Sequence, residues 1–120
     1  MATYNEPTHA AEYLVSEANG ARSRDEGVLA AGNLPAGAVL ALNGDGDYVS
    51  LDPDGSASGT DKAKAILYAA TDASTAPQPC TVHARACEVE KAALTLPDGI
   101  TDPQTKTAMS DLTQRGIIPR

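Results

Sequence analysis

Three residues with reactive side chains lie close together in the sequence, at Cys80, His83 and Cys87. Thiolates and imidazole are zinc ligands, and a cysteine beside a histidine is also the pairing of a nucleophile with its base. Structural zinc needs four convergent ligands, however, and the other histidine, His9, lies in a polar N-terminal stretch. The residues alone therefore favour a surface histidine at position 83. A small metal-binding or hydrolytic domain that uses His83 and the cysteines stays as the alternative.

The two cysteines are predicted to be reduced. If residues 80–89 form one strand, Cys80 and Cys87 face opposite sides and lie about 20 Å apart, at about 3.3 Å per residue. That separation excludes a disulfide within the strand.

Carboxylates also occur at a suggestive spacing. Asn43, Asp45, Asp47 and Asp54 correspond to positions 1, 3, 5 and 12 of a calcium-binding loop. Tyr48, however, stands where the sharp turn of such a loop needs glycine, and no helix is predicted on either side. We interpret this stretch as a solvated acidic turn. Since no nucleophile elbow and no glycine-rich phosphate loop is recognisable either, the sequence predicts no enzyme, no cofactor and no metal.

Composition limits the class of protein further. The chain has 120 residues, enough for one domain, and contains ten Gly, eight Pro and neither Trp nor Phe. Its core must therefore be thin, and we expect full stability only on association with other subunits. The net charge of −7 with scattered basic residues argues against nucleic acid as a partner. No stretch approaches the roughly 18 apolar residues of a membrane span, and no signal peptide is evident.

Aliphatic residues concentrate in two stretches. In the first, Gly27–Leu42, two short strands flank Asn33-Leu34-Pro35-Ala36-Gly37, which has the composition of a tight turn. We therefore predict a core hairpin there, with Lys62–Ala70 as the strand that packs against it.

Other segments carry weaker signals. We predict a short strand at Tyr48–Leu51 and a long half-buried strand at Cys80–Val89. Loops are predicted at Ala18–Gly27, Asp52–Asp61 and Asp72–Pro79, and a strand or one helical turn at Glu90–Leu96. The charged residues within the first loop, Arg22 and Arg24 among them, are read as solvated, with a subunit contact as the alternative.

One helix is clearly indicated, over Pro103–Arg115. Thr101 and Gln104 have the spacing of a capping box, and Gly116 suits the residue that follows the last turn. A short apolar strand, Ile117-Ile118, is expected after it.

The N-terminal part is different in character. Met1–Ala11 is polar and has no period, so it reads as a flexible arm. Glu12–Glu17 is short and β-prone with nothing local to pair with, which predicts an edge strand or a strand added to another chain. The predicted fold class is α+β: a small barrel-like domain of mostly short β-strands over residues 18–120, with one C-terminal helix and an extended arm over residues 1–17.

Several short motifs resemble, in order and spacing, the lambda-type head decoration proteins of tailed bacteriophages. The resemblance covers about residues 12–118 and rests on Tyr13-Leu14-Val15-Ser16-Glu17, Asn19-Gly20, Ser23-Arg24, Leu34-Pro35-Ala36-Gly37-x-Val39-Leu40, Ala65-Ile66-Leu67-Tyr68 and Leu112-x-x-x-Gly116-Ile117.

This resemblance implies a structural protein and not an enzyme. It implies a homotrimer, made in the bacterial host cytoplasm, that binds the major capsid protein at local three-fold positions on the outer surface of the expanded capsid and stabilises the virion against DNA pressure. A structural component of the phage tail or fibre stays as a further alternative to capsid decoration. The resemblance also implies that the N-terminal arm contacts the capsid. We expect deletion of residues 1–17 to abolish binding without unfolding the domain. The residues we predict for capsid contact are Thr8, Glu12, Tyr13, Leu14 and Val15, with Arg22 and Arg24 as weaker candidates.

Overall fold

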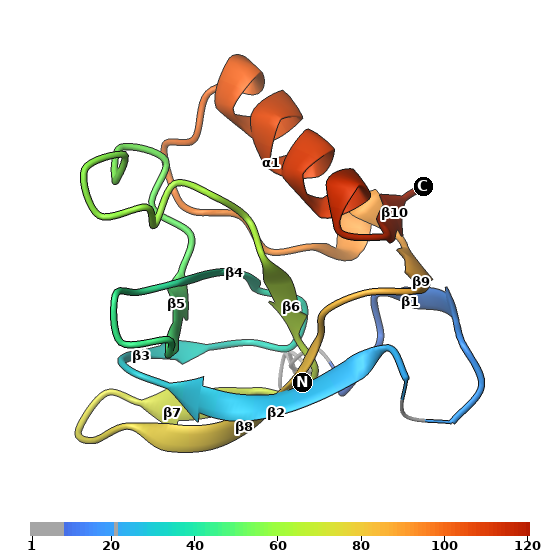
Figure 1. Cartoon of the computed structure of the whole chain (residues 1–120), viewed down its shortest axis with the longest axis horizontal. Coiled ribbons are helices and arrows are strands. Elements are labelled where there is room, and N and C mark those ends of the chain that lie inside the picture. Colours follow the sequence, from blue (N-terminus) through green and yellow to red (C-terminus); the bar gives the residue numbers. More distant parts are fainter. Residues whose placement is uncertain (1–8, 21) are drawn as a thin grey trace, which may run out of the picture.

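A closed five-stranded barrel forms the main body of the molecule, with the C-terminal helix above it in Figure 1. The computed structural model describes residues 9–20 and 22–120. In order around the barrel, its strands are β2 (Arg24–Leu29), β5 (Tyr48–Ser50), β4 (Val39–Leu42), β6 (Ala65–Leu67) and β8 (Gln78–His83). The prediction of a small β-barrel with a C-terminal helix is confirmed.

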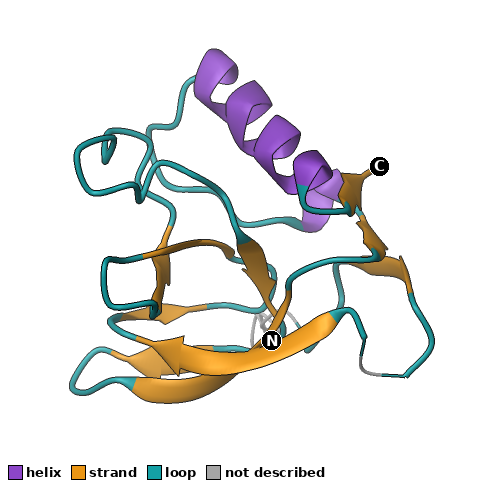
Figure 2. Cartoon of the chain, in the orientation of Figure 1, coloured by secondary structure: helices purple, strands orange, loops and turns teal. Residues whose placement is uncertain are grey.

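The remaining elements are attached to this barrel (Figure 2). One small sheet has the order β1-β9-β10, and a second sheet pairs β3 with β7. A helical turn, η1, and the helix α1 complete the fold. The bounds are β1 (Leu14–Glu17), β3 (Gly32–Leu34), β7 (Thr71–Ala73), β9 (Cys87–Val89), η1 (Lys91–Ala93), α1 (Asp102–Gln114) and β10 (Ile117–Pro119).

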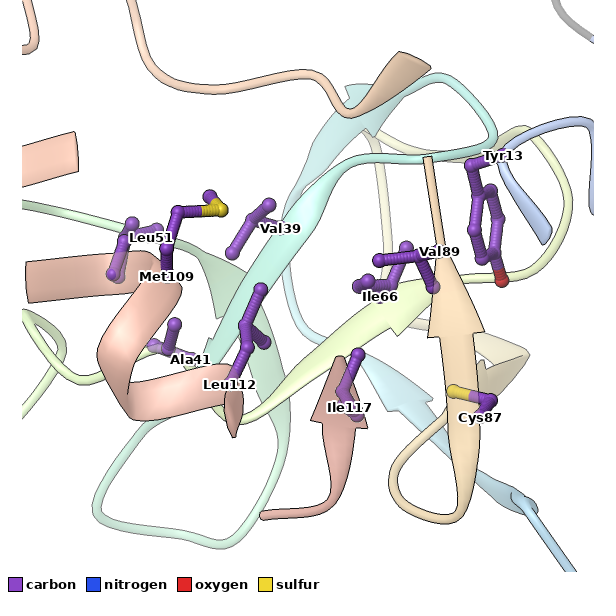
Figure 3. Close-up of a cluster of buried hydrophobic side chains, with 12 residues drawn as sticks. Tyr13, Val39, Ala41, Leu51, Ile66, Cys87, Val89, Met109, Leu112 and Ile117 are labelled. Atoms are coloured by element: carbon purple, nitrogen blue, oxygen red, sulfur yellow. The ribbon is translucent and has the colours of Figure 1, made fainter. Parts of the chain in front are cut away.

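Strands β4 and β6 are buried on both faces, which explains why their sequences are continuously apolar. Leu40 and Leu67 belong to one cluster, with Leu29 and Val82 of the barrel. Val39 and Ile66 belong to the other, beneath helix α1 (Figure 3). Because neighbouring side chains of a strand point to opposite faces, each strand contributes to two cores, as strands covered on both sides do. The predicted packing of residues 62–70 against the first stretch is confirmed by the β4–β6 pairing.

Helix α1 begins and ends close to the predicted residues because local signals set both ends. The Thr101 hydroxyl accepts a hydrogen bond from the Gln104 backbone N–H, and the Gln104 side chain accepts one from the Thr101 N–H. Gly116 takes a positive φ of 84° after the last turn. Met109 and Leu112 face the core in Figure 3.

The predicted hairpin within Gly27–Leu42 is wrong. Strand β2 pairs along its whole length with β8, from Arg24 opposite His83 to Leu29 opposite Gln78. The intervening β3 pairs with β7, and β4 pairs with β5 and β6. The Pro35–Gly37 turn exists, but it directs the chain into the barrel instead of back along β2. Closing the barrel requires these long-range pairings, which the local sequence pattern does not encode.

The single strand predicted for Cys80–Val89 is also wrong. Strand β8 ends at His83 and β9 begins at Cys87, with a turn between them in which Ala86 has a positive φ of 53°. Both cysteines are free and buried. The prediction that His83 lies on the surface is wrong as well, because this side chain is 0% exposed.

Two further segments differ from expectation and two agree with it. Asp72–Pro79 is not all loop, since it contains most of β7 and the start of β8. Arg24 lies in β2 instead of a solvated loop. Glu12–Glu17, predicted to be an edge strand or a strand added to another chain, contains β1, which pairs antiparallel with β9 at one end of its sheet, so the edge-strand prediction is confirmed. Glu90–Leu96 was predicted to be a strand or one helical turn, and the structure has the helical turn η1 there.

Candidate functional site

Strand β1 joins the N-terminal stretch to the folded domain. Tyr13, just before it, is fully buried, whereas Val15 within it is 56% exposed. The β1 end of the β1-β9-β10 sheet order has no further strand in the described part of the chain. The exposed Val15 therefore lies on an edge strand that a partner chain can reach.

A buried hydrogen-bonded chain fixes the root of this strand. The Tyr13 hydroxyl lies 2.5 Å from Nδ1 of His83, and Nε2 of His83 lies 2.7 Å from Oε2 of Glu17. Glu17 is ionised, so it accepts the hydrogen bond, and His83 then carries its proton on Nε2 and accepts from Tyr13 through Nδ1. This arrangement satisfies every polar atom of a histidine that has no access to solvent.

Glu17 is the centre of the network. Arg24 donates from Nη2 to Oε1 at 2.6 Å and from Nε to Oε2 at 3.2 Å, and the Ser23 hydroxyl donates to Oε2 at 2.6 Å. These hydrogen bonds, with that of Arg24 foremost, lower the pKa of Glu17 to about 2. The Arg24 guanidinium also lies 4.8 Å from the centre of the Tyr68 ring.

Burial keeps Tyr13 and His83 neutral. It lowers the pKa of His83 below the ordinary value of 6.5, although the carboxylate of Glu17 opposes this. Burial likewise raises the pKa of Tyr13. A neutral histidine between a hydroxyl and an ionised carboxylate forms a rigid structural link, and both ring nitrogens are already engaged by protein groups.

The cysteines offer little nucleophilic character. Burial raises the pKa of Cys80, and it raises that of Cys87 to about 11. At neutral pH both are thiols, whereas the nucleophile and the metal ligand are the thiolate. Within residues 9–20 and 22–120, no three or more His, Cys, Asp or Glu side chains are grouped so as to hold a metal ion.

The residues predicted for partner contact fall into three groups. Thr8 lies outside the described residues. Glu12, Val15 and Arg22 are exposed and Leu14 is half-buried. Tyr13 is buried and the Arg24 side chain is 34% exposed, and both take part in the internal network described above.

Sequence reasoning did not group Glu17, Ser23 and His83 with Tyr13 and Arg24. Tyr13 and His83 are 70 positions apart, and only the β-strand pairings bring them together. The sequence held one usable signal, which is the scarcity of aromatic residues. The chain has only four, all Tyr, and two of them, Tyr13 and Tyr68, contact the His83 ring.

A comparison with models of known protein families identifies a family for this chain. The family model of bacteriophage lambda head decoration protein D matches residues 3–117 of this chain. None of the curated proteins that were compared matches it. In the described part of the chain, no helix is long and apolar enough to cross a membrane.

Proposed function

Because the chain belongs to the bacteriophage lambda head decoration protein D family, we propose that it binds the outer surface of an expanded phage capsid as a homotrimer at local three-fold positions. Proteins of this family are structural components of the virion capsid surface. The observation that carries the proposal is the family match, which extends over nearly the whole chain.

The proposed role is to hold neighbouring major capsid subunits together against the pressure of packaged DNA. Trimeric binding would combine several modest contacts into a strong attachment through multivalency. We place the capsid contact on the N-terminal stretch, including Thr8 and Glu12, and on Leu14 and Val15, with Arg22 as a weaker candidate. The exposed edge strand β1 supports this placement, because an extended capsid segment can pair with such an edge.

The direct test mixes the purified protein with expanded and with unexpanded shells of a phage that encodes it. We expect co-sedimentation with expanded shells only, and retention of packaged DNA on heating of decorated particles. Equal binding to both shell forms would contradict a role after expansion. Absence of binding to either form would contradict decoration altogether.

The contact surface needs a separate test with two matched variants. Val15→Ser removes the exposed apolar side chain from β1, while Val28→Ser does so on β2, where Val28 is 36% exposed. We expect the first variant to bind expanded shells more weakly and the second to bind normally. The opposite order would place the contact on the β2 side of the barrel.

A further inference from the structure

Only some of the basic residues of this acidic chain form ion pairs with its carboxylates. Arg24, Arg85 and Arg120 form ion pairs with Glu17, Asp25 and Glu88. Among residues 9–20 and 22–120, which include all nine basic residues, no other Lys or Arg forms an ion pair. Three of the six remaining cations, Lys62, Lys64 and Arg115, line a single cleft of about 380 Å³.

The backbone that carries the two lysines is held firmly. Ala63 between them is buried, and its N–H donates to Oδ2 of Asp111 on α1 at 3.3 Å. The N–H of Lys64 donates to the Leu40 carbonyl at 2.8 Å. With Ala63 directed inward, the two flanking lysines lie on the outer side, beside Arg115 at the end of α1.

The cleft therefore has an excess of positive charge. Asp111 is the one carboxylate that lines it, and one of its oxygens accepts from Ala63. A fixed cleft with three cations suits a ligand that presents two or more carboxylates. Long nucleic acids fit poorly, because the net charge of −7 repels a polyanion.

A matching acidic feature occurs elsewhere on the same chain. The turn Asn43–Asp47 joins β4 to β5, and the Asn43 side-chain oxygen accepts from the N–H groups of Asp45 and Asp47 at 2.9 and 3.0 Å. This bonding makes the turn a rigid tip. The carboxylates of Asp45 and Asp47 have no hydrogen bond or ion pair within the described chain.

We propose that the turn Asn43–Asp47 of one copy docks into the Lys62–Lys64–Arg115 cleft of a neighbouring copy. The inference rests on the homotrimer of the proposed function and names the contact that builds it. Since the tip and the cleft are different patches, the contact is head-to-tail, and three such contacts close a ring when each rotation is 120°. Every copy then gives one tip and receives one.

The test uses full-length variants with reversed charges. We expect Lys62→Glu/Lys64→Glu and Asp45→Lys/Asp47→Lys each to weaken assembly roughly tenfold or more, measured by sedimentation and light scattering over a range of concentrations. The fourfold variant with both pairs reversed keeps the net charge of −7 and restores complementarity, so it should assemble like the original protein. Circular dichroism and urea unfolding check that every variant folds.

A matched control separates the local contact from net charge. Lys91→Glu/Lys106→Glu carries the same net charge as the first variant, but neither lysine lines the cleft, so its assembly should be normal. Normal assembly of both reversed pairs, or failure of the fourfold variant to recover, would overturn the proposal. An original protein that decorates shells but is monomeric would overturn this contact and leave decoration standing. Loss of shell binding by the lysine variant with intact trimers would assign the cleft to the capsid instead.

Discussion

Tyr13 connects the N-terminal stretch to the barrel through a single hydroxyl. Tyr13→Phe keeps the ring in the core but leaves Nδ1 of His83 without a donor. A buried acceptor without its partner costs about 1–3 kcal/mol, so we expect the free energy of unfolding to fall by that amount. Urea unfolding followed by circular dichroism measures the loss.

Tyr48→Phe is the matched control for this change. Tyr48 is half-buried, and its hydroxyl makes no hydrogen bond within residues 9–20 and 22–120. We expect its unfolding midpoint to stay within experimental error of the original. Equal losses in both variants would mean that the Tyr13–His83 hydrogen bond contributes nothing specific.

The same network predicts how stability depends on pH. The pKa of His83 is lowered in the folded state because burial disfavours the charged form, so the folded protein loses stability as the pH falls below the ordinary value of 6.5. The pKa of Glu17 falls from 4.5 to about 2, chiefly because of Arg24, so its contribution is complete above pH 4.5 and disappears toward pH 2. We expect urea midpoints to decline in both ranges.

The variant Glu17→Gln tests whether Glu17 causes the loss of stability between pH 4.5 and pH 2. Glu88 also has a lowered pKa, mainly because Arg120 donates to it, so part of the acid loss belongs to that pair. The Glu17→Gln protein should start less stable at neutral pH and lose less between pH 4.5 and pH 2 than the original. Parallel curves for the two proteins would contradict the assignment.

At the scale of elements, Gly37 sets how closely the turn before β4 approaches η1. Its φ is 92°, and a Cβ at this position would lie 2.9 Å from the Ala93 carbonyl oxygen. Gly99 has a φ of 76° with nothing within 4 Å of such a Cβ. We expect Gly99→Ala to lose about 1–2 kcal/mol through backbone strain alone. Gly37→Ala should lose clearly more in the same urea assay, and similar losses would show that the close approach relaxes without cost.

Some secondary-structure elements could be predicted from the sequence and others could not. Helix α1 was predicted to within one residue at each end, because the Thr101–Gln104 capping box and Gly116 act over a few positions. The two buried stretches were also found, since apolar density is a local property. The barrel pairings and the break at Ala86 were missed, because they depend on contacts between distant strands and on a positive φ that alanine rarely adopts.

The candidate site was likewise predicted only in part. The sequence pointed to the segment before residue 18, and the family resemblance supplied the reason for its importance. The sequence did not reveal that Tyr13 and Glu17 are anchored inside the domain. Their partners come from distant places: Ser23 lies in the turn before β2, Arg24 in β2 and His83 in β8. Alternation along an assumed single strand placed His83 on the wrong side.

For the whole molecule, this anchoring gives different expectations for two truncations. Removing residues 2–8 leaves Tyr13, β1 and the network intact, so the protein should unfold at nearly the same urea concentration as the original. It should nevertheless bind expanded shells poorly, because we assign part of the capsid contact to that segment. Shell co-sedimentation and urea unfolding of the same preparation test both statements.

Removing residues 2–17 has a structural cost as well. It takes away β1, which pairs with β9, and the fully buried Tyr13, and it leaves His83 without either partner. Losing a large buried aromatic side chain alone costs about 3–5 kcal/mol, which is a large part of the stability of a small domain. We therefore expect this protein to be unfolded or strongly destabilised, contrary to our expectation from the sequence that the domain stays folded without residues 1–17. A cooperative unfolding transition at the original urea midpoint would show that residues 13–17 are an appendage and that the buried network does not support the barrel.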